Sequence, residues 1–278
     1  MIWKTPRHSF DLTHRGLIMG VLNVTPDSFS DGGRFLALEN AVARAREMEA
    51  EGADIIDIGG ESTWPGAQAV PADEELRRII PVVRAVREQT RCALSVDTMK
   101  AAVAAAAMAA GADIINDVSG LHADSDMAAV AARTGAALVL MHMQGTPENM
   151  QSQPDYADVI AEIQASLRHS INTARAAGVA LESIALDPGI GFGKTLEHNL
   201  AILRDPCAFG LDGRPVLLGV SRKSFIARIL GQGDPAARKW PTVALTSLAR
   251  ERGARILRVH DVRENVHALR MTEAILHS

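Results

Sequence analysis

One pattern is repeated eight times along the 278 residues of this chain. In each repeat, a short run of aliphatic and β-branched residues leads into polar residues or glycine, and a segment of helical composition follows. The aliphatic runs occupy residues 17–24, 54–60, 92–98, 113–118, 137–142, 184–189, 215–221 and 255–261. Regular alternation of strand and helix implies parallel strands with right-handed crossovers. Eight such units predict an α/β fold of the (β/α)8 TIM-barrel type rather than an open sheet.

The segments between the runs have the features of helices. Residues 37–53 and 73–90 carry apolar residues on one face and charged residues on the other, and the alanine-rich segment 99–112 has the highest helix propensity in the chain. Glycines that suit the end of a helix precede three of the runs, at positions Gly52, Gly111 and Gly253. No proline- or serine-rich linker divides the chain. We therefore expect residues 1–278 to form a single domain, with about the first 15 residues as a lead-in segment.

Charge and composition argue against several classes of protein. The formal net charge of −4 does not favour the broad positive surface that nucleic acids require. The two cysteines, Cys92 and Cys207, are far apart in the sequence, which favours a reducing compartment over a disulfide framework. The amino-terminal residues lack the apolar segment of a secretory signal, and the apolar run from Ala101 is too short to span a membrane. We expect a cytoplasmic protein with no nucleic-acid or membrane partner.

Polar residues stand at the end of almost every predicted strand. They are Asn23, Glu61 with Ser62 and Thr63, Asp97, Asn116 with Asp117, His142, Asp187, the segment Ser221–Ser224, and Arg258 with His260. Taken singly, Asp97 or Asp117 is more often the N-cap of the next helix than a functional group. In a (β/α)8 barrel, however, these strand ends share one face, and so many polar groups in a partly buried crater require a polar ligand. The set predicts a binding site at the carboxyl-terminal face of the barrel.

The residue types indicate what this site binds. Asp97, Asn116 and Asp187 offer carboxylates and an amide, which suit the N–H and C=O groups along the edge of a flat heterocycle. Lys223 and Arg258 supply positive charge, and a guanidinium can also stack on a ring. One half of the site is therefore suited to an amino-heterocycle and the other half to an anion.

Two further features belong to the anion-binding half. Residues 221–230 follow a strand and begin a helix, whose free N–H groups attract a phosphate or a carboxylate. Ser224 also fits a simple helix cap, and the two roles are compatible. His260 comes two residues after Arg258, so both side chains leave their strand on the same side.

Several common catalytic motifs are missing from the sequence. Residues 188–195 approach a phosphate-binding P-loop, but that motif needs glycine where Pro188 stands, and Lys194 breaks the dinucleotide pattern G-x-G-x-x-G. Neither a G-x-S-x-G elbow nor an H-E-x-x-H helix occurs, so acyl-enzyme and zinc-hydrolase chemistry lose support. His142, taken alone, is best interpreted as a packed residue at the barrel mouth.

Eight short motifs, in this order, resemble those of dihydropteroate synthase, the folate-pathway transferase. They are NVTPDSFSDGG from Asn23, IIDIGGEST from Ile55, SVDT from Ser95, IINDVSG from Ile114, LMHMQGTP from Leu140, LDPGIGFGK from Leu186, SRKSFI from Ser221 and RVHDV from Arg258. The resemblance covers residues 17–269 and implies a (β/α)8 barrel that is usually homodimeric and works with Mg²⁺. The implied reaction joins 6-hydroxymethyl-7,8-dihydropterin diphosphate to 4-aminobenzoate and releases diphosphate.

The resemblance also implies roles for individual residues. The implied pterin-binding residues are Asp97, Asn116, Asp187, Lys223 and Arg258, and the implied diphosphate-binding residues are Thr63, Arg258 and His260. The implied aminobenzoate pocket involves Phe29, Pro65, Phe192 and Ser224, and the metal-linked residue is Asn23. Residues 25–33 are expected to act as a mobile lid over the diphosphate. The catalytic residues expected from this set are Asp97, Lys223, Arg258 and His260.

The groups present favour a dissociative, SN1-like substitution. Diphosphate with Mg²⁺ is a good leaving group, and the dihydropterin ring can delocalise a cation at its exocyclic carbon, so no nucleophilic residue is needed. Asp97 is expected to stabilise the developing positive charge, while Mg²⁺, Arg258 and His260 stabilise the departing oxygens. 4-Aminobenzoate then attacks with its neutral amine.

Three positions depart from the family pattern. Trp64 stands where the family has arginine, so the loop loses a charge that could pair with an anion. Pro241 replaces a glycine near the start of a helix, and Ile190 replaces a common phenylalanine. Because of Trp64, a pterin-binding paralogue without synthase activity stays open as an alternative. A pterin-dependent methyltransferase barrel ranks below both.

Overall fold

Eight parallel strands form a barrel at the centre of the structure, a computed structural model that describes residues 1–24, 33–62, 64, 66–231 and 234–278, apart from the side chains of residues 33–37 and 235. The strands are β3 (Leu17–Asn23), β4 (Ile55–Gly59), β5 (Ala93–Asp97), β6 (Ile114–Asp117), β7 (Ala137–Met141), β8 (Ile184–Asp187), β9 (Leu217–Leu218) and β10 (Ile256–Val259). They pair in the order β8-β7-β6-β5-β4-β3-β10-β9. A parallel bridge between Leu186 of β8 and Val216, just before β9, closes the circle. The predicted TIM barrel is confirmed, and each of the eight aliphatic runs contains one strand.

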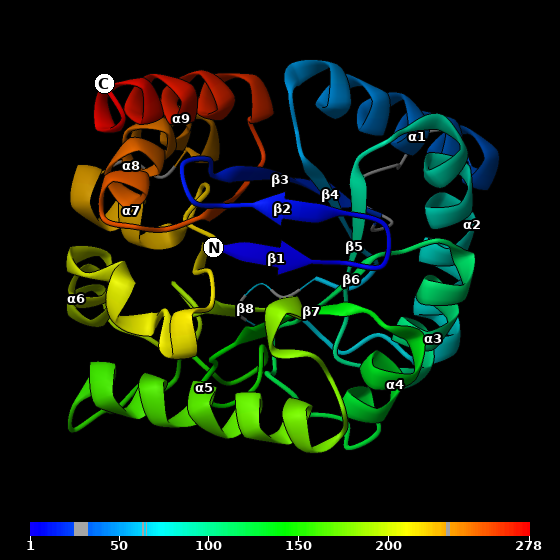
Figure 1. Ribbon diagram of the computed structural model, residues 1–278, viewed down its shortest axis with the longest axis horizontal. Coiled ribbons are helices and arrows are strands. Elements are labelled where there is room, and N and C mark those ends of the chain that lie inside the picture. The colour runs from blue at the N-terminus through cyan, green and yellow to red at the C-terminus, as the bar shows by residue number, and fades with distance from the viewer. Residues whose placement is uncertain (25–32, 63, 65, 232–233) are drawn as a thin grey trace.

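Helices surround the barrel, as Figure 1 shows. They are α1 (Gly33–Glu51), α2 (Ala72–Gln89), α3 (Ala101–Ala110), α4 (Met127–Thr134), α5 (Val159–Ala176), α6 (Leu196–Arg204), α7 (Ser224–Leu230), α8 (Lys239–Glu251) and α9 (Val262–Leu276). Short 3₁₀ turns occupy Leu181–Ser183, Pro206–Phe209, Leu211–Gly213 and Pro235–Arg238. The helices predicted within residues 37–53, 73–90 and 99–112 are all present. The glycine after α3, Gly111, has φ 115°, as its predicted place at a helix end requires.

The amino-terminal lead-in segment forms a β-hairpin of its own. Strand β1 (Ile2–Lys4) pairs antiparallel with β2 (Ser9–Asp11), and Figure 1 shows the hairpin lying across the middle of the barrel. Trp3 and Leu12 are fully buried against the first inward-facing residues of the barrel strands. Arg7 fastens the hairpin, because its Nε lies 2.8 Å from the buried Asp113 carboxylate. The hairpin therefore closes the amino-terminal end of the barrel.

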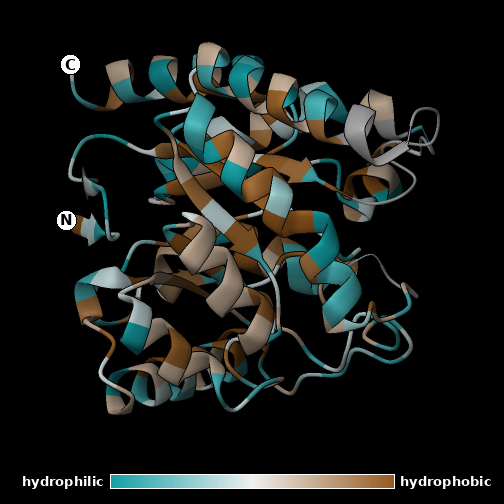
Figure 2. Ribbon diagram, turned by 90° about the vertical axis from the view of Figure 1, so that its right-hand side faces the viewer, coloured by the Kyte–Doolittle hydropathy of each residue, from teal (hydrophilic) through white to brown (hydrophobic). Residues whose placement is uncertain are grey.

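The barrel interior changes from apolar to polar along its axis. Near the hairpin the inward side chains are aliphatic, and they are Leu17, Met19, Ile55, Ala93, Ile114, Ala137, Val139, Ala185, Leu217 and Ile256. Two residues further along several of the strands the same face carries polar groups, such as Asp57 and Ser95, because successive side chains alternate between the two faces. In Figure 2 the strands are largely brown and the surrounding helices carry teal residues. The polar side chains of the barrel interior therefore lie toward its carboxyl-terminal end.

Within the described residues, every helix is too short or too polar to cross a membrane.

Candidate active site

A cavity of about 380 Å³ lies at the carboxyl-terminal ends of the barrel strands. Seven of the expected site residues line it, namely Asn23, Asp97, Phe192, Lys223, Ser224, Arg258 and His260. Trp64 also lines it. Asn116 and Asp187 are buried at the ends of β6 and β8 rather than in the cavity lining, with 3% and 6% of their surface exposed. Phe29, Thr63 and Pro65 lie outside the described residues, as do residues 25–32 of the expected lid, whereas Gly33 begins α1.

Arg258 is the central cation of the cavity. Strand β10 presents its guanidinium to two carboxylates, with Nε 2.6 Å from Asp57 Oδ2 and Nη2 2.8 Å from Asp97 Oδ2. Burial disfavours the charged guanidinium, but the two carboxylates outweigh this effect and raise the pKa of Arg258. The group is therefore a permanent cation held in one orientation.

The two buried carboxyl groups of the expected pterin site are harder to ionise than usual. Burial raises the pKa of Asp97, with Asp57 and Glu75 adding to the effect and Arg258 opposing it. Burial likewise raises the pKa of Asp187 to about 6, although its Oδ1 accepts a 2.7 Å hydrogen bond from the Gly189 N–H. Neither side chain caps a helix. A ligand cation or N–H group placed beside them would therefore favour their ionised form.

Lys223 extends over an aromatic ring in the cavity wall. Its Nζ lies 4.0 Å from the centre of the Phe192 ring, a cation–π contact. Burial and the charge of Arg258 lower the pKa of Lys223 to about 8. The backbone of Gly191, with φ 80°, allows this approach, because a Cβ there would lie 3.2 Å from Lys223 Cδ.

His260 is a neutral hydrogen-bonding group in the free protein. Its Nδ1 lies 2.9 Å from the hydroxyl of Ser221, and burial together with the charge of Arg258 lowers the pKa of His260 to about 4. At pH 7 the imidazole can donate or accept hydrogen bonds but carries no charge. An anion bound beside it would raise this pKa.

The turn that carries Lys223 is held in an unusual conformation. Arg222 has φ 57°, a left-handed conformation that is rare for a side-chain-bearing residue, and its guanidinium pairs with both carboxylate oxygens of Asp261. Ser224 is the first residue of α7, whereas Lys223 occupies the N-cap position without a side-chain cap. The interpretation of Ser224 as the helix cap is therefore wrong by one residue, because α7 begins at Ser224, one residue earlier than that interpretation requires. The Ser224 hydroxyl is left exposed on the cavity wall.

Other strand-end residues have structural partners. Glu61 accepts a hydrogen bond from the Val70 N–H and pairs with Lys100. Asp117 accepts hydrogen bonds from the backbone N–H groups of Ser119 and Leu121, so it stabilises its own loop. These contacts agree with a structural role for Asp117, whereas Glu61 also lines the cavity.

The glycine-rich segment 188–194 packs against the end of β7. His142 is 7% exposed, and its Nδ1 lies 3.0 Å from the ammonium of Lys194, which also donates to the Phe192 carbonyl. Burial lowers the pKa of Lys194 to about 7 and that of His142 to about 3. His142 is thus a packed residue, as expected, and Lys194 fastens the loop that carries Phe192.

The three departures from the family pattern have different settings. The Trp64 indole is 61% exposed at the edge of the cavity. Pro241 is the third residue of α8, where a missing N–H costs nothing because the first turn has no intrahelical acceptor. Ile190 is 1% exposed and packs in the core. Of the three changes, only Trp64 alters the cavity.

Asp57 is a site residue that the sequence analysis missed. It lies in the middle of β4, is fully buried, and contacts both Arg258 and Asn116. The available signal was a carboxylate within the aliphatic run 54–60. It lies two residues before Gly59 and therefore faces the same side of the strand, toward the barrel interior. Its partner on β10 is 201 residues away in the sequence.

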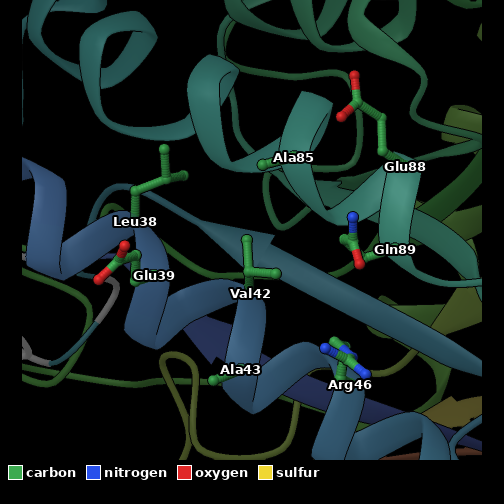
Figure 3. Close-up of a pocket in the computed structure, with 8 residues that line it drawn as sticks. All are labelled: Leu38, Glu39, Val42, Ala43, Arg46, Ala85, Glu88 and Gln89. Carbon is green, nitrogen blue, oxygen red and sulfur yellow. The ribbon is translucent and has the colours of Figure 1, made fainter.

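A second hollow, of about 320 Å³, lies between α1 and α2 on the outside of the barrel. Figure 3 shows its lining, which combines aliphatic side chains such as Leu38 and Val42 with charged ones such as Glu39 and Arg46. No strand-end group contributes to it. The hollow is a groove between two surface helices rather than part of the candidate active site.

Comparisons with known proteins point to one family. The sequence pattern of the family described as "Pterin binding enzyme" matches residues 19–260. The chain is 47% identical over 268 residues to dihydropteroate synthase of Escherichia coli K12, which covers 96% of this chain and 94% of that protein. It is also similar to the structure of Yersinia pestis dihydropteroate synthase with a sulfonamide drug, with TM-score 0.93, 44% identity and full coverage of both chains. The structure of Xanthomonas albilineans dihydropteroate synthase with 4-aminobenzoic acid has TM-score 0.91 and 44% identity, covering 99% of this chain and 100% of that one.

Proposed function

Because the chain belongs to the pterin-binding enzyme family, we propose that it is a transferase that catalyses the dihydropteroate synthase reaction. The reaction condenses 6-hydroxymethyl-7,8-dihydropterin diphosphate with 4-aminobenzoate to give 7,8-dihydropteroate and diphosphate. The observation that carries this proposal is one cavity that combines Asp97 with the cations Lys223 and Arg258, in a chain similar over nearly its whole length to known synthases. This arrangement suits a substrate with a hydrogen-bonding heterocycle at one end and an anion at the other.

The pterin ring is proposed to bind against the buried strand ends. Asp97, Asn116 and Asp187 offer acceptors and an amide to its N–H and C=O edge. Lys223 adds a donor beside them, and the guanidinium of Arg258 covers the ring face. Supporting this arrangement, Lys223 and Arg258 both act on the pKa of Asp187, so the three charged groups lie close together.

The diphosphate is proposed to bind at the rim, to Arg258, His260 and Thr63. Neutral His260 donates a hydrogen bond, or takes up a proton as the anion approaches. Asn23 would hold Mg²⁺ together with diphosphate oxygens, since an amide oxygen is a suitable ligand for this ion. Within the described residues no cluster of three histidine, cysteine or acidic side chains is built to hold a metal, which suits an ion that arrives with the diphosphate. When bound, Mg²⁺ would neutralise charge on the leaving group.

The substitution is proposed to be dissociative. The bond between the exocyclic carbon and the diphosphate oxygen breaks first, and the ionised Asp97 stabilises the positive charge that spreads over the ring. Arg258 and His260 stabilise the negative charge on the departing oxygen. The neutral amine of 4-aminobenzoate then forms the new carbon–nitrogen bond and loses one proton.

The 4-aminobenzoate pocket is proposed to lie at Phe192 and Ser224, with Phe29 and Pro65 completing it. Phe192 supplies an apolar wall, and it packs with Met150 and Met141. The Ser224 hydroxyl supplies a donor for the carboxylate of the second substrate.

Steady-state kinetics with both natural substrates test the proposal. The wild-type chain is expected to release diphosphate from the pterin substrate only when 4-aminobenzoate is present. Trp64→Arg adds a charge at the cavity rim, so the KM for the pterin diphosphate is expected to fall by about threefold to tenfold, while the KM for 4-aminobenzoate stays unchanged. Trp64→Phe, which keeps a ring without a charge, is the matched control and should leave both constants near the wild-type values.

The same assay distinguishes the alternative function. A pterin-binding paralogue would bind the pterin substrate without turning it over, and only Trp64→Arg would be active. That outcome would refute the synthase proposal for the wild-type chain.

We further propose that the active protein is a cytoplasmic homodimer. Of the nine exposed large hydrophobic side chains among the described residues, six lie on α7, α8 and α9, and these are Ile229, Leu230, Trp240, Met271, Ile275 and Leu276. Helices α8 and α9 pack on each other, and α7 lies beside them in Figure 1. Clusters of this kind mark protein interfaces, here with a second copy of the chain. Two free thiols, Cys92 and Cys207, are in keeping with a reducing compartment.

A further inference from the structure

Asp57 is a buried carboxylate that the proposed reaction does not use. It lies in the middle of β4, where its register partners are Val21 on β3 and Ser95 on β5. Its side chain points into the barrel beneath the cavity and is fully buried. A carboxylate at such a depth is costly unless other groups compensate it, so its partners indicate why it is there.

One oxygen of Asp57 holds two residues of the proposed pterin site. Oδ2 accepts a 2.6 Å hydrogen bond from Nε of Arg258 and a 3.1 Å hydrogen bond from the side-chain amide of Asn116. Arg258 also donates a 2.8 Å hydrogen bond from Nη2 to Oδ2 of Asp97. Asp57 thus lies at the centre of a network that links four strands, β4, β5, β6 and β10.

The bond to Asn116 determines which way the amide faces. Because the NH₂ group is directed at Asp57, the amide oxygen is the group that remains for a ligand beside Asn116. An oxygen accepts hydrogen bonds, so this position selects a ligand N–H. A free asparagine could turn by half a rotation and offer either group.

We propose that Asp57 is a positioning residue and a determinant of specificity for the heterocycle. It fixes the amide of Asn116 as an acceptor toward the ring edge, and it holds the guanidinium of Arg258 in place over Asp97. The inference rests on the proposed function and deepens it.

The charge of Asp57 has a second effect, on Asp97. The charged groups that act on Asp97 are Arg258, Asp57, Glu75 and Lys223, and Asp57 and Glu75 raise its pKa. Removing the Asp57 charge would let Asp97 ionise more easily and leave Arg258 with Asp97 as its remaining carboxylate partner. The acidic limb of the pH–rate profile should therefore move to lower pH.

Two variants separate these effects. Asp57→Asn keeps a carbonyl acceptor but removes the charge, so the acidic limb of kcat/KM is expected to move down by about one pH unit. Asp57→Ala removes the acceptor and frees the Asn116 amide to turn. The preference of Asp57→Ala for 6-hydroxymethylpterin over the analogue with oxygen in place of the exocyclic amino group is expected to fall at least about tenfold. Direct binding measurements give this preference.

Asp113→Asn is the matched control. Asp113 is also fully buried and pairs with two arginines, Arg7 and Arg87, but it lies at the opposite end of the barrel. Its variant should lose stability without moving the pH limb or the ligand preference. A merely structural role for Asp57 would give this same result.

The outcomes separate the inference from the function. A wild-type chain that neither binds the pterin nor turns it over would refute the proposed function. An active wild type whose Asp57 variants keep the pH limb and the ligand preference would refute the inference. Should the variants fail to fold, hydrogen exchange of the Asn116 side-chain NH₂ in the wild type gives the check, assigned by its loss in Asn116→Asp. Slow exchange without ligand supports the inference, and rapid exchange overturns it.

Discussion

Three ionisable side chains of the candidate site, Asp97, Asp187 and Lys223, have pKa values that are shifted toward neutrality from both sides. Burial raises the pKa of Asp97 and brings that of Asp187 to about 6, whereas it lowers that of Lys223 to about 8. Each shift has the same cause, because a low-dielectric environment disfavours the charged form of acids and bases alike. The ionised carboxylates and the protonated lysine therefore coexist over a narrow pH range.

This arrangement predicts a pH dependence for the wild-type enzyme. Asp97 must be ionised to stabilise the cation, so kcat/KM should fall as the pH is lowered through the range between about 7 and 6, above the usual range for an aspartate. Loss of the Lys223 proton should lower it again above about pH 8. Circular dichroism at each pH controls for unfolding. A rate that stays constant from pH 5 to pH 9 would contradict the assigned roles.

At the scale of elements, the loop after β8 is held on several sides. Tyr156 donates its hydroxyl to the Gly193 carbonyl at 2.8 Å, and Gln151 donates to the Gly191 carbonyl at 2.8 Å. Gly189, with φ 73°, lies so close to β7 that a Cβ would come within 1.9 Å of the His142 carbonyl oxygen. The loop that carries Phe192 is therefore a fixed wall of the cavity rather than a flexible cover.

Gly189→Ala is expected to lower the free energy of unfolding by about 3 kcal/mol or more, because both the backbone conformation and the contact with β7 are lost. Gly135→Ala is the matched control. Gly135 has a similar φ of 71°, but a Cβ there would meet nothing within 4 Å, so its cost should be about 1 kcal/mol. Urea unfolding measures both changes. Equal losses would show that the close approach at Gly189 is unimportant.

At the scale of the whole molecule, the two ends of the barrel and the side formed by α7, α8 and α9 differ in which side chains they carry. The hairpin closes the amino-terminal end with Trp3, the carboxyl-terminal end holds the cavity, and α7, α8 and α9 expose apolar side chains on one side. Single exposed apolar residues are ordinary, and the proposed dimer interface rests on the number of them on these neighbouring helices.

Ile275→Glu is expected to shift the proposed dimer to monomer, with a rise of at least about tenfold in the dissociation constant. Ile275 is 71% exposed, and at a two-fold interface the added charge would occur twice and be buried without a partner. Sedimentation velocity measures the change. Ile2→Glu, at an exposed apolar position on the hairpin, is the control and should leave the assembly unchanged. A wild-type chain that sediments as a monomer at micromolar concentration would contradict the proposal.

The sequence by itself determined the features that depend on local chemistry. Aliphatic runs located all eight barrel strands, and glycines such as Gly111 located helix ends, because strand periodicity and left-handed backbone are properties of short segments. The rule that parallel strands end on one face then placed Asp97, Lys223 and Arg258 at one cavity.

Only the tertiary structure decided which polar groups pair with one another. The contact of Asp57 with Arg258 depends on barrel closure, and the pairing of Glu61 with Lys100 depends on how two loops meet. The lead-in segment likewise closes the amino-terminal end of the barrel because its Trp3 packs against inward-facing residues from many strands. Such contacts join residues far apart in the chain, so they follow from strand register and packing and leave no periodic signal in the sequence.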